Sequence, residues 1–382
     1  MHNSAKPRIM FVVQSLVKGG AERLVLEISR ELIRRDAAEI LIVGFENRNE
    51  YPELSEGISF VHAAITYQLS VFGNNRIEIN SLLQLINEFK PDIIHTNCYL
   101  QEAPPREVVF PDIKYFSHLH DNMPAFRNLK FLDLFKRPRL AEYYEKRRLI
   151  RKYKKCHNTF ISISENTSSY FRKNLPGVLA EKIILLPNAI DFKKFYDLRA
   201  REFDGNKTIQ LINVGHFAPK KNQIFLLKVV KILKEKNSNV FLKFVGDYKT
   251  VKEDFLKEAE QLGVRDSIEM TGMVSNVEQY LKQADIYVHS ALYEPFGLVL
   301  LEAMAAGLPV VCLDGGGNRD IMEDGKNGFI IYEQNAELFA DKIMELITNK
   351  QLYSAMSFYA IEFAKKYDIK EYVDNLLKLY KD

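Results

Sequence analysis

The chain has 382 residues, 47% of them hydrophobic and 27% charged, with a formal net charge of +3. This length exceeds what one hydrophobic core usually organises, so we expect two domains, and the composition excludes a disordered or fibrous chain. The three cysteines lie far apart with no CxxC pair, which argues against a disulfide framework or a zinc site.

No apolar run approaches the length that spans a bilayer. The N-terminal stretch MHNSAKPRIMFVV lacks the long apolar segment of a signal peptide and leads straight into an expected strand. We therefore expect a cytoplasmic protein, one that can still touch the inner face of the cell membrane.

The net charge is unevenly distributed. Residues 127–155 contain twelve Lys or Arg and three acids, a net charge of +9, so the rest of the chain carries −6. A local basic surface is therefore expected.

Short apolar runs alternate with longer amphipathic segments, a pattern that predicts parallel sheets built from βαβ units. In the first half, helices are expected at 21–35 and 81–90. The strands expected there are 8–16, 39–45, 91–98, 114–120 and 158–164.

The pattern restarts after the polar, charged stretch 185–207, which has the composition of a linker. Strands are then expected at 208–215, 239–247, 267–272, 284–290, 308–313 and 328–332. We predict two doubly wound, Rossmann-like α/β domains facing across a cleft, with ligands at the carboxyl ends of the strands. The predicted division is 1–186 for the first Rossmann-like domain, 187–366 for the second and 367–382 for a helix crossing back onto the first domain.

Two carboxylates flank a Phe-Gly step in EPFGLVLLEAMAAG, which runs from Glu294 to Gly307. Glu294 follows an expected strand, and Gly297 lies at the first turn of a helix, whose free N–H groups suit a phosphate. Glu302 lies on an otherwise apolar helix, where an unpaired carboxylate would be costly. We interpret the stretch as a nucleotide-sugar site, with Glu302 on the ribose, the Gly297 turn on the phosphate and Glu294 on the sugar. The alternative, a helix cap and a surface acid, leaves the apolar neighbours of Glu302 unexplained.

This stretch resembles the E-x7-E signature of glycosyltransferase family 4, retaining enzymes with the two-domain GT-B fold. The likeness covers nearly the whole chain, and its ordered set of segments is more specific than any one of them. Those segments are VKGGAERLVLEISREL, PDIIHTN, ISISENTSSYF, LLPNAIDFKKF, VGHFAPKKN, FVGDY, MTGMVSNVEQYL and DGGGNRDIMEDGKNGFII. The resemblance implies that Phe296 and Leu298 join Gly297 in binding the donor.

The segment GHFAPKKNQ, residues 215–223, is similar to a family pattern in which a lysine contacts the leaving diphosphate. Lys221 falls on that lysine, and a cation there stabilises the charge that develops as the sugar–phosphate bond breaks. The sequence departs from the pattern twice. His216 replaces the usual arginine, and we expect it to contact phosphate with a pH-dependent charge. Lys220 replaces the usual glutamate, and we expect it to be a solvated turn residue.

In the first half, Gly19 and Gly20 precede a helix, so their backbone can approach a phosphate or sugar. No GxGxxG occurs there, which weakens a dehydrogenase interpretation. The resemblance implies that His120 lies near the donor sugar and contributes to catalysis, and His95 is a weaker acceptor-side residue. His118 is expected to point the opposite way from His120.

No two aspartates are spaced as Asp-x-Asp, and no compact His/Asp/Glu set has metal-ligand spacing. We therefore expect neither a metal nor a cofactor, with lysine and helix N-termini taking the metal's role. The nucleotide base is expected to pack on Gly272, Met273 and Val274. UDP is preferred to GDP on family frequency alone.

The basic segment 127–155 interleaves cations with Phe, Leu and Tyr. A solvated helix face is the simplest interpretation. Nucleic-acid binding is disfavoured because the rest of the chain is acidic and no such motif appears. Peripheral contact with an anionic membrane is preferred, since cations and aromatics both favour its interface.

These features predict a retaining glycosyltransferase that moves a sugar from a nucleotide-sugar to a glycan or lipid-pyrophosphate-linked acceptor in surface-polysaccharide biosynthesis. Two alternatives stay open. One is a nucleotide-sugar epimerase or a phosphorylase of similar fold. The other is a non-catalytic nucleotide- or glycan-binding accessory protein, against which the intact Glu294, Glu302 and Lys221 argue.

Overall fold

The computed structural model describes residues 6–70, 74–97, 101–130, 133, 136–198, 207–248 and 252–381. Cys98 and part of the basic segment, residues 131, 132, 134 and 135, lie outside the described residues. The chain forms two compact units: unit 1 joins Met1–Asn188 to Ile369–Asp382, and unit 2 is Ala189–Asp368.

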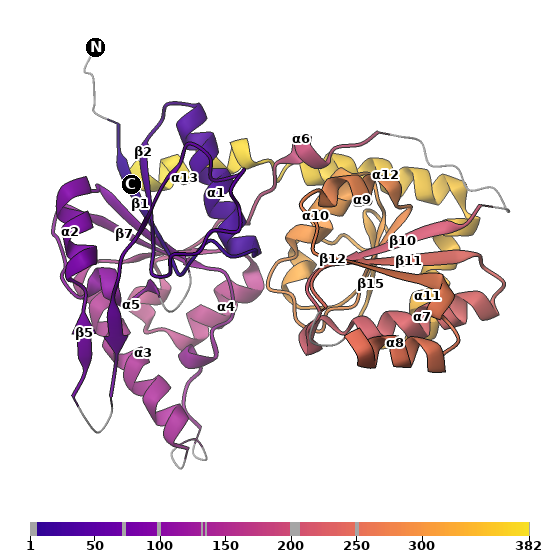
Figure 1. Cartoon of the computed structure of the whole chain (residues 1–382), viewed down its shortest axis with the longest axis horizontal. Coiled ribbons are helices and arrows are strands. Elements are labelled where there is room, and N and C mark those ends of the chain that lie inside the picture. Colours follow the sequence, from indigo (N-terminus) through magenta and orange to yellow (C-terminus); the bar gives the residue numbers. More distant parts are fainter. Residues whose placement is uncertain are drawn as a thin grey trace. The chain divides into compact units, whose positions relative to one another are not determined.

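Unit 1 is built on a parallel sheet with strand order β3-β2-β1-β6-β7-β8-β9 (Figure 1). Its strands are β1 Arg8–Val13, β2 Glu39–Gly44, β3 Ser59–His62, β6 Ile93–Asn97, β7 Lys114–Leu119, β8 Thr159–Ser162 and β9 Ile183–Leu185. A separate antiparallel hairpin consists of β4 Thr66–Gln68 and β5 Arg76–Glu78. The helices are α1 Gly20–Arg34, α2 Asn80–Phe89, α3 Arg137–Lys155, α4 Glu165–Asn174, α5 Gly177–Ala180 and α13 Ile369–Lys381, with 3₁₀ turns η2 Pro104–Arg106 and η3 Pro124–Phe126.

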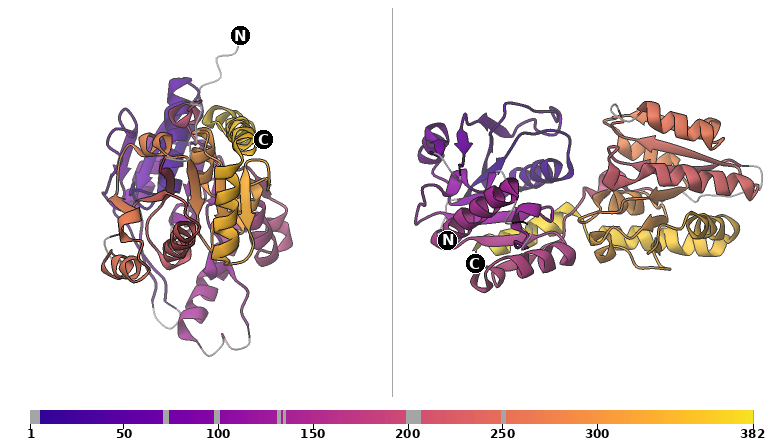
Figure 2. Two further views of the ribbon diagram at one scale, coloured as in Figure 1. Left: turned by 90° about the vertical axis from the view of Figure 1, so that its right-hand side faces the viewer. Right: turned by 90° about the horizontal axis from the view of Figure 1, so that it is seen from below.

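Helix α13 comes from the far end of the chain and packs beside α1 in unit 1 (Figures 1 and 2). Its apolar side chains are buried at helical spacing, among them Ile369, Val373 and Leu376. This amphipathic face explains why the last helix docks on the sheet of the first unit.

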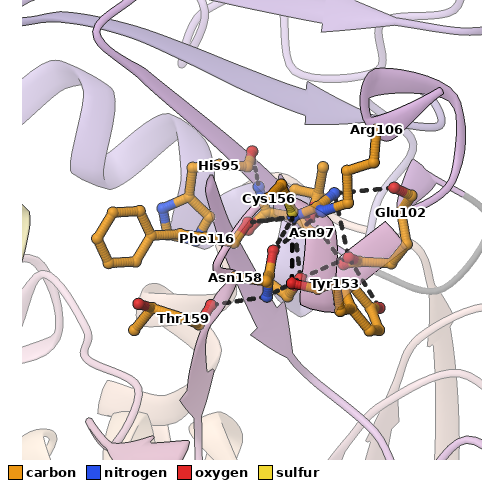
Figure 3. A network of polar contacts seen from close by, with 11 residues as sticks. His95, Asn97, Glu102, Arg106, Phe116, Tyr153, Cys156, Asn158 and Thr159 are labelled. Carbon is orange, nitrogen blue, oxygen red and sulfur yellow. Dashed lines mark hydrogen bonds and ion pairs between the residues drawn. The ribbon is translucent and has the colours of Figure 1, made fainter. Parts of the chain in front are cut away.

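A buried polar network ties the segment around η2 and α3 to this sheet (Figure 3). Glu102 and Arg106 form a fully buried ion pair at 3.3 Å. Arg106 also donates to Oδ1 of Asn158 at 2.6 and 2.9 Å, and Glu102 accepts from Oη of Tyr153 at 3.0 Å. Because these charges are paired and hydrogen-bonded, their burial is tolerated and fixes the position of α3.

Unit 2 is a second parallel sheet, with strand order β12-β11-β10-β13-β14-β15. Its strands are β10 Ile209–Val214, β11 Val240–Val245, β12 Ile268–Gly272, β13 Ile286–His289, β14 Val310–Leu313 and β15 Gly328–Ile331. The helices are α6 Phe192–Phe195, α7 Gln223–Glu235, α8 Lys252–Gln261, α9 Val277–Gln283, α10 Leu298–Ala305, α11 Ala336–Thr348 and α12 Lys350–Lys365, with 3₁₀ turns η5 Pro219–Lys221, η6 Arg265–Ser267 and η7 Gly317–Asp320.

Both sheets reverse their strand order next to the first strand of the unit, β1 beside β6 and β10 beside β13. Such switch points open crevices at the carboxyl ends of the strands, where ligands of doubly wound sheets bind. The predicted fold class, two Rossmann-like α/β units, is confirmed. Every apolar run expected to form a strand contains one, because strands buried on both faces are almost continuously hydrophobic. In the described part of the chain, no helix is both long and apolar enough to cross a bilayer.

Candidate functional site

Glu294 lies in the loop between β13 and α10, and its side chain is buried, 7% exposed. Its carboxylate accepts from Nζ of Lys221 at 2.6 Å and faces Nε2 of His289 at 3.0 Å. Burial raises the pKa of Glu294, but the hydrogen bond from His289 and the charge of Lys221 outweigh it and hold the pKa at about 2. Burial lowers the pKa of His289, so a neutral ring donates its Nε2–H to the carboxylate.

Lys221 reaches Glu294 from η5, at the carboxyl end of β10 and 73 positions earlier in the chain. The two loops are tied together through their backbones. Oγ of Ser290 donates to the carbonyl of Lys221 at 2.8 Å, and the N–H of Leu292 donates to the carbonyl of Lys220 at 2.8 Å. Two residues that the sequence singled out separately therefore form one acid–base contact at the edge of one sheet.

His216 lies in the same loop as Lys221, two residues after β10, and its side chain is exposed. Partial burial and the neighbouring charges of Lys221 and Lys220 lower its pKa. The imidazole is therefore mostly neutral at pH 7, and it can offer a phosphate an N–H donor but little charge. Lys220 is exposed, as expected, with its ammonium 5.6 Å from the ring centre of Tyr293.

The Gly297 turn begins α10. Gly297 has φ +103° and ψ +51°, a left-handed conformation that glycine adopts without strain. Leu298 follows as the first residue of the helix, and Phe296 is buried, with its ring 6.2 Å from that of Tyr367. The first residue of α10 thus lies four positions after Glu294, and the backbone N–H groups of its first turn are suited to an anion.

Glu302 lies on α10 and is 1% exposed. The surface-acid alternative for Glu302 is therefore wrong, because five of the other seven residues of this helix are also buried. The helix ends at Ala305, and Gly307, with φ +72°, closes its C-terminal end as the sequence predicted. Burial raises the pKa of the Tyr287 hydroxyl, and the charges of Glu294 and Glu302 raise it further.

A glycine-rich loop after β14 holds Glu294 from the other side; its sequence DGGGNRD was recognised as a family segment, but no role in the site was predicted for it. The N–H of Glu294 donates to the carbonyl of Gly315 at 2.8 Å, and its carbonyl accepts from Gly317 at 2.9 Å. A Cβ at Gly317 would lie 1.9 Å from the carbonyl oxygen of Pro295, so only glycine fits there. His289 was missed as well, although a polar residue at the carboxyl end of an otherwise apolar strand was a usable signal.

Gly272, Met273 and Val274 lie at and just beyond the carboxyl end of β12. Gly272 has φ +79°, and its carbonyl accepts from the N–H of Gly246 at 3.0 Å. The side chain of Met273 is 47% exposed. This segment therefore lies at the same edge of the sheet as the Lys221 loop, where a base could pack.

In unit 1, His120 lies one residue beyond β7 and is half-buried, with Nε2 3.3 Å from Oδ1 of Asn97. Burial lowers its pKa to about 3, so its ring is neutral. The expectation for His118 was wrong: residues two apart on a strand share a face. The rings of His118 and His120 have centroids 4.0 Å apart.

His95 lies in the middle of β6 and is fully buried. Its Nδ1 is 2.5 Å from Oη of Tyr380 in α13. Burial lowers the pKa of His95 to about 3. Through this contact His95 helps to hold α13 against the sheet. Its acceptor-side role stays a prediction.

Gly19 and Gly20 lie at the start of α1, on the carboxyl side of β1. The backbone N–H and carbonyl of Gly19 both bond to Oη of Tyr51 at 2.9 Å. The carboxylate of Glu22 lies over this turn, since a Cβ at Gly19 would be 2.3 Å from its Oε2. An acidic side chain therefore occupies the helix N-terminus where a phosphate or sugar was predicted.

The comparisons with known proteins agree with this architecture. A model described as Glycosyltransferase Family 4 matches residues 18–194, and one described as Glycosyl transferases group 1 matches residues 196–363. The two matches together cover most of the chain. The chain belongs to the family 4 type of glycosyltransferases with a GT-B fold.

Individual relatives are distant. The chain is 27% identical to spore coat protein SA of Bacillus subtilis (strain 168) over 95% of each protein. It is 24% identical to the Escherichia coli UDP-Gal:alpha-D-GlcNAc-diphosphoundecaprenol alpha-1,3-galactosyltransferase, over 53% of this chain and 54% of that enzyme. The crystal structure of Anabaena Alr3699/HepE in complex with UDP and glucose superposes with a TM-score of 0.77 at 20% identity, covering 98% of this chain and 99% of that one. The matches span about half the length of the first curated relatives, from 42% to 58%.

Proposed function

We propose that the protein transfers a sugar from a nucleotide-sugar to an acceptor hydroxyl with retention of configuration at the transferred carbon. The contact between Glu294 and Lys221, braced by His289, supports this best. In this proposal Glu294 accepts hydrogen bonds from sugar hydroxyls, and Lys221 beside it is the cation for the leaving diphosphate, near the N-terminus of α10. Glu302 is proposed to accept hydrogen bonds from the ribose.

In the proposed reaction, the bond between the sugar carbon and the diphosphate oxygen breaks as the acceptor oxygen bonds to the same face of the carbon. The proton of the acceptor hydroxyl passes to the departing phosphate oxygen. Lys221, His216 and the α10 N-terminus stabilise the negative charge on the leaving group, and no metal is needed in this scheme. The Gly19–Gly20 turn, His120 and the Gly272–Val274 segment are proposed as further donor contacts.

The proposed donor and acceptor rest on the chemistry of the site and on analogy with two similar proteins. UDP is the proposed nucleotide because the similar fold of HepE is described in complex with UDP and glucose. A glycan on a lipid pyrophosphate is the proposed acceptor because the Escherichia coli relative is named for such a substrate. Assembly of a surface polysaccharide follows from that acceptor. The basic segment 127–155 is proposed to bring the enzyme to the anionic inner face of the membrane.

Two adjacent lysines provide the test. Lys221→Ala should lower the rate of UDP-sugar hydrolysis by about 10²-fold or more, because the cation that stabilises the negative charge of the leaving group is removed. Lys220→Ala is the matched control and should stay within about twofold, because the Lys220 side chain is exposed and contacts a ring rather than the carboxylate. A panel of nucleotide-sugars is first screened by thermal shift, since a bound donor raises the melting temperature.

Near-normal turnover in Lys221→Ala would refute the assigned role. The alternatives are separated by the products. An epimerase changes the sugar without an acceptor and leaves the mass of the nucleotide-sugar unchanged, a phosphorylase requires free phosphate, and an accessory protein binds nucleotide without consuming it.

A further inference from the structure

A pocket of about 570 Å³ lies in unit 1 between α3 and the turn that follows α4. Five cationic side chains line it: Lys146, Arg147, Arg151, Lys154 and Lys173. Among the described residues no acidic side chain lines it. Its volume falls within the range of small-molecule sites, roughly 300–1,000 Å³.

The cations of α3 are sorted by helix face. Arg148 and Lys152, one turn apart, both pair with Glu107, the former at 2.7 Å. Arg147, Arg151 and Lys154 follow the i, i+4, i+7 spacing of a neighbouring stripe. In the part of the chain that the structure describes, no carboxylate pairs with any of these three. Like charges stacked in this way destabilise a helix, so an anionic ligand between them would relieve an unfavourable repulsion.

The burial of Lys146 distinguishes this pocket from an ordinary basic helix face that only contacts solvent. It is only 4% exposed, and its ammonium donates to the carbonyl of Phe126 at 2.5 Å and to Oδ1 of Asn128 at 2.9 Å. Both acceptors are neutral, and within the described ranges no carboxylate forms an ion pair with this ammonium. Burial together with the charge of Arg139 lowers the pKa of Lys146. A buried ammonium surrounded by four exposed cations creates a strong positive potential in the pocket. Burying this charge is unfavourable, and a helix face exposed only to water would have no need of it.

We propose that this pocket binds a phosphate-bearing group, such as a phosphate or pyrophosphate. Arg147 and Arg151 supply guanidinium forks that match phosphate oxygens, and the lysines add point charges. The ligand is carried either by a lipid headgroup or by a phosphate compound free in solution. This pocket would give the proposed membrane contact a defined binding site instead of a diffuse basic surface. Its ligand binding does not depend on the transfer reaction.

The test compares two double variants with the same loss of charge on the same segment. Arg151→Gln with Lys154→Gln removes two pocket cations. Lys136→Gln with Arg137→Gln removes two exposed cations at the start of α3, outside the pocket lining. Binding of inorganic pyrophosphate to the full chain is measured by calorimetry with saturating UDP, so that the donor site is occupied. The pocket variant should lose about tenfold in affinity and the other variant less than about twofold.

Flotation with vesicles of phosphatidylcholine alone, or with about one third phosphatidylglycerol, distinguishes the sources of the ligand. Binding to anionic vesicles that only the pocket variant loses identifies a lipid headgroup. Pyrophosphate binding without vesicle binding identifies a free phosphate compound. Equal losses in the two variants, or no pyrophosphate binding by the wild type, would overturn the proposal. Donor hydrolysis is a separate measurement, so failure here leaves the proposed transfer reaction standing, and the reverse also holds.

Discussion

The carboxyl of Glu294 couples the stability of unit 2 to pH. Its pKa is lowered from 4.5 to about 2, because His289 and Lys221 outweigh the effect of burial. A group whose folded-state pKa lies below its unfolded-state value stabilises the fold above the higher pKa and loses this contribution as the pH falls toward the lower one. The free-energy gap between the wild type and Glu294→Gln should therefore narrow by about 2 kcal/mol between about pH 6 and pH 3.

Urea denaturation of both proteins at several pH values measures this gap. A gap that stays constant across the acidic range would show that the carboxylate is not held ionised by its neighbours. The gap at neutral pH also contains the loss of the hydrogen bonds to Lys221 and His289, so only its change with pH reports the pKa.

At the scale of single residues, the sequence predicted the acids and the lysine but not their contact. Glu294 and Glu302 stood out because each broke a local pattern, and Lys221 stood out by resemblance. Gly317 contacts Glu294 from a turn that lies far along the chain, and such a nonlocal contact leaves no pattern within a short window. His289 lies only five positions before Glu294, and its polar side chain at the end of an apolar strand was a signal that the prediction overlooked. Glu22 lies only three positions from Gly19, in the first turn of the same helix, and the prediction of a phosphate or sugar at that turn overlooked its carboxylate.

Among the elements, α13 shows how a chain end can stabilise a distant unit. Leu376 is fully buried in the face that packs on unit 1, and Arg35 donates to the carbonyl of Lys370 at 2.9 Å. Truncation of a buried leucine leaves a cavity, so Leu376→Ala should destabilise unit 1 by roughly 2–5 kcal/mol. Lys378→Ala, on the exposed face of the same helix, should change the stability by less than about 0.5 kcal/mol.

Hydrogen exchange shows which unit loses stability in Leu376→Ala. Amides of β6 and β7 should exchange faster in Leu376→Ala, while those of β10 to β15 keep their protection, because α13 packs within unit 1. Equal loss of protection in both units would contradict this assignment of α13.

Three of the strands that the sequence missed, β3, β4 and β5, share one cause. Strands β3, β4 and β5 are three or four residues long, and none of their residues is buried. They therefore lack the apolar run that predicted the central strands. The long strands of both sheets were found because a strand covered by helices on both faces must be apolar throughout.

At the scale of the whole molecule, the division into two parallel sheets followed from the restart of the strand–helix pattern. The ordered family segments assigned most of the predicted donor contacts to the second sheet, and their role stays a prediction. The sequence could not say which side chains are neutralised. Arg148 and Lys152 pair with Glu107, whereas Arg151 and Lys154 have no carboxylate partner among the described residues, a difference that emerges only when α3 is placed against its neighbours.

The placement of the Lys221, Glu294 and Gly315 loops on unit 2 predicts where a nucleotide acts. UDP at about 100 times its Kd should stabilise the unit that binds it by about 2.7 kcal/mol. We expect hydrogen exchange to slow in residues 215–222, 292–298 and 314–318, which lie at the carboxyl ends of β10, β13 and β14. In Lys221→Ala the same UDP concentration should protect these loops less, since one phosphate contact is gone, while Lys220→Ala should match the wild type. Protection that spared these loops would place the nucleotide elsewhere and remove the basis for the proposed roles of Glu294 and Lys221.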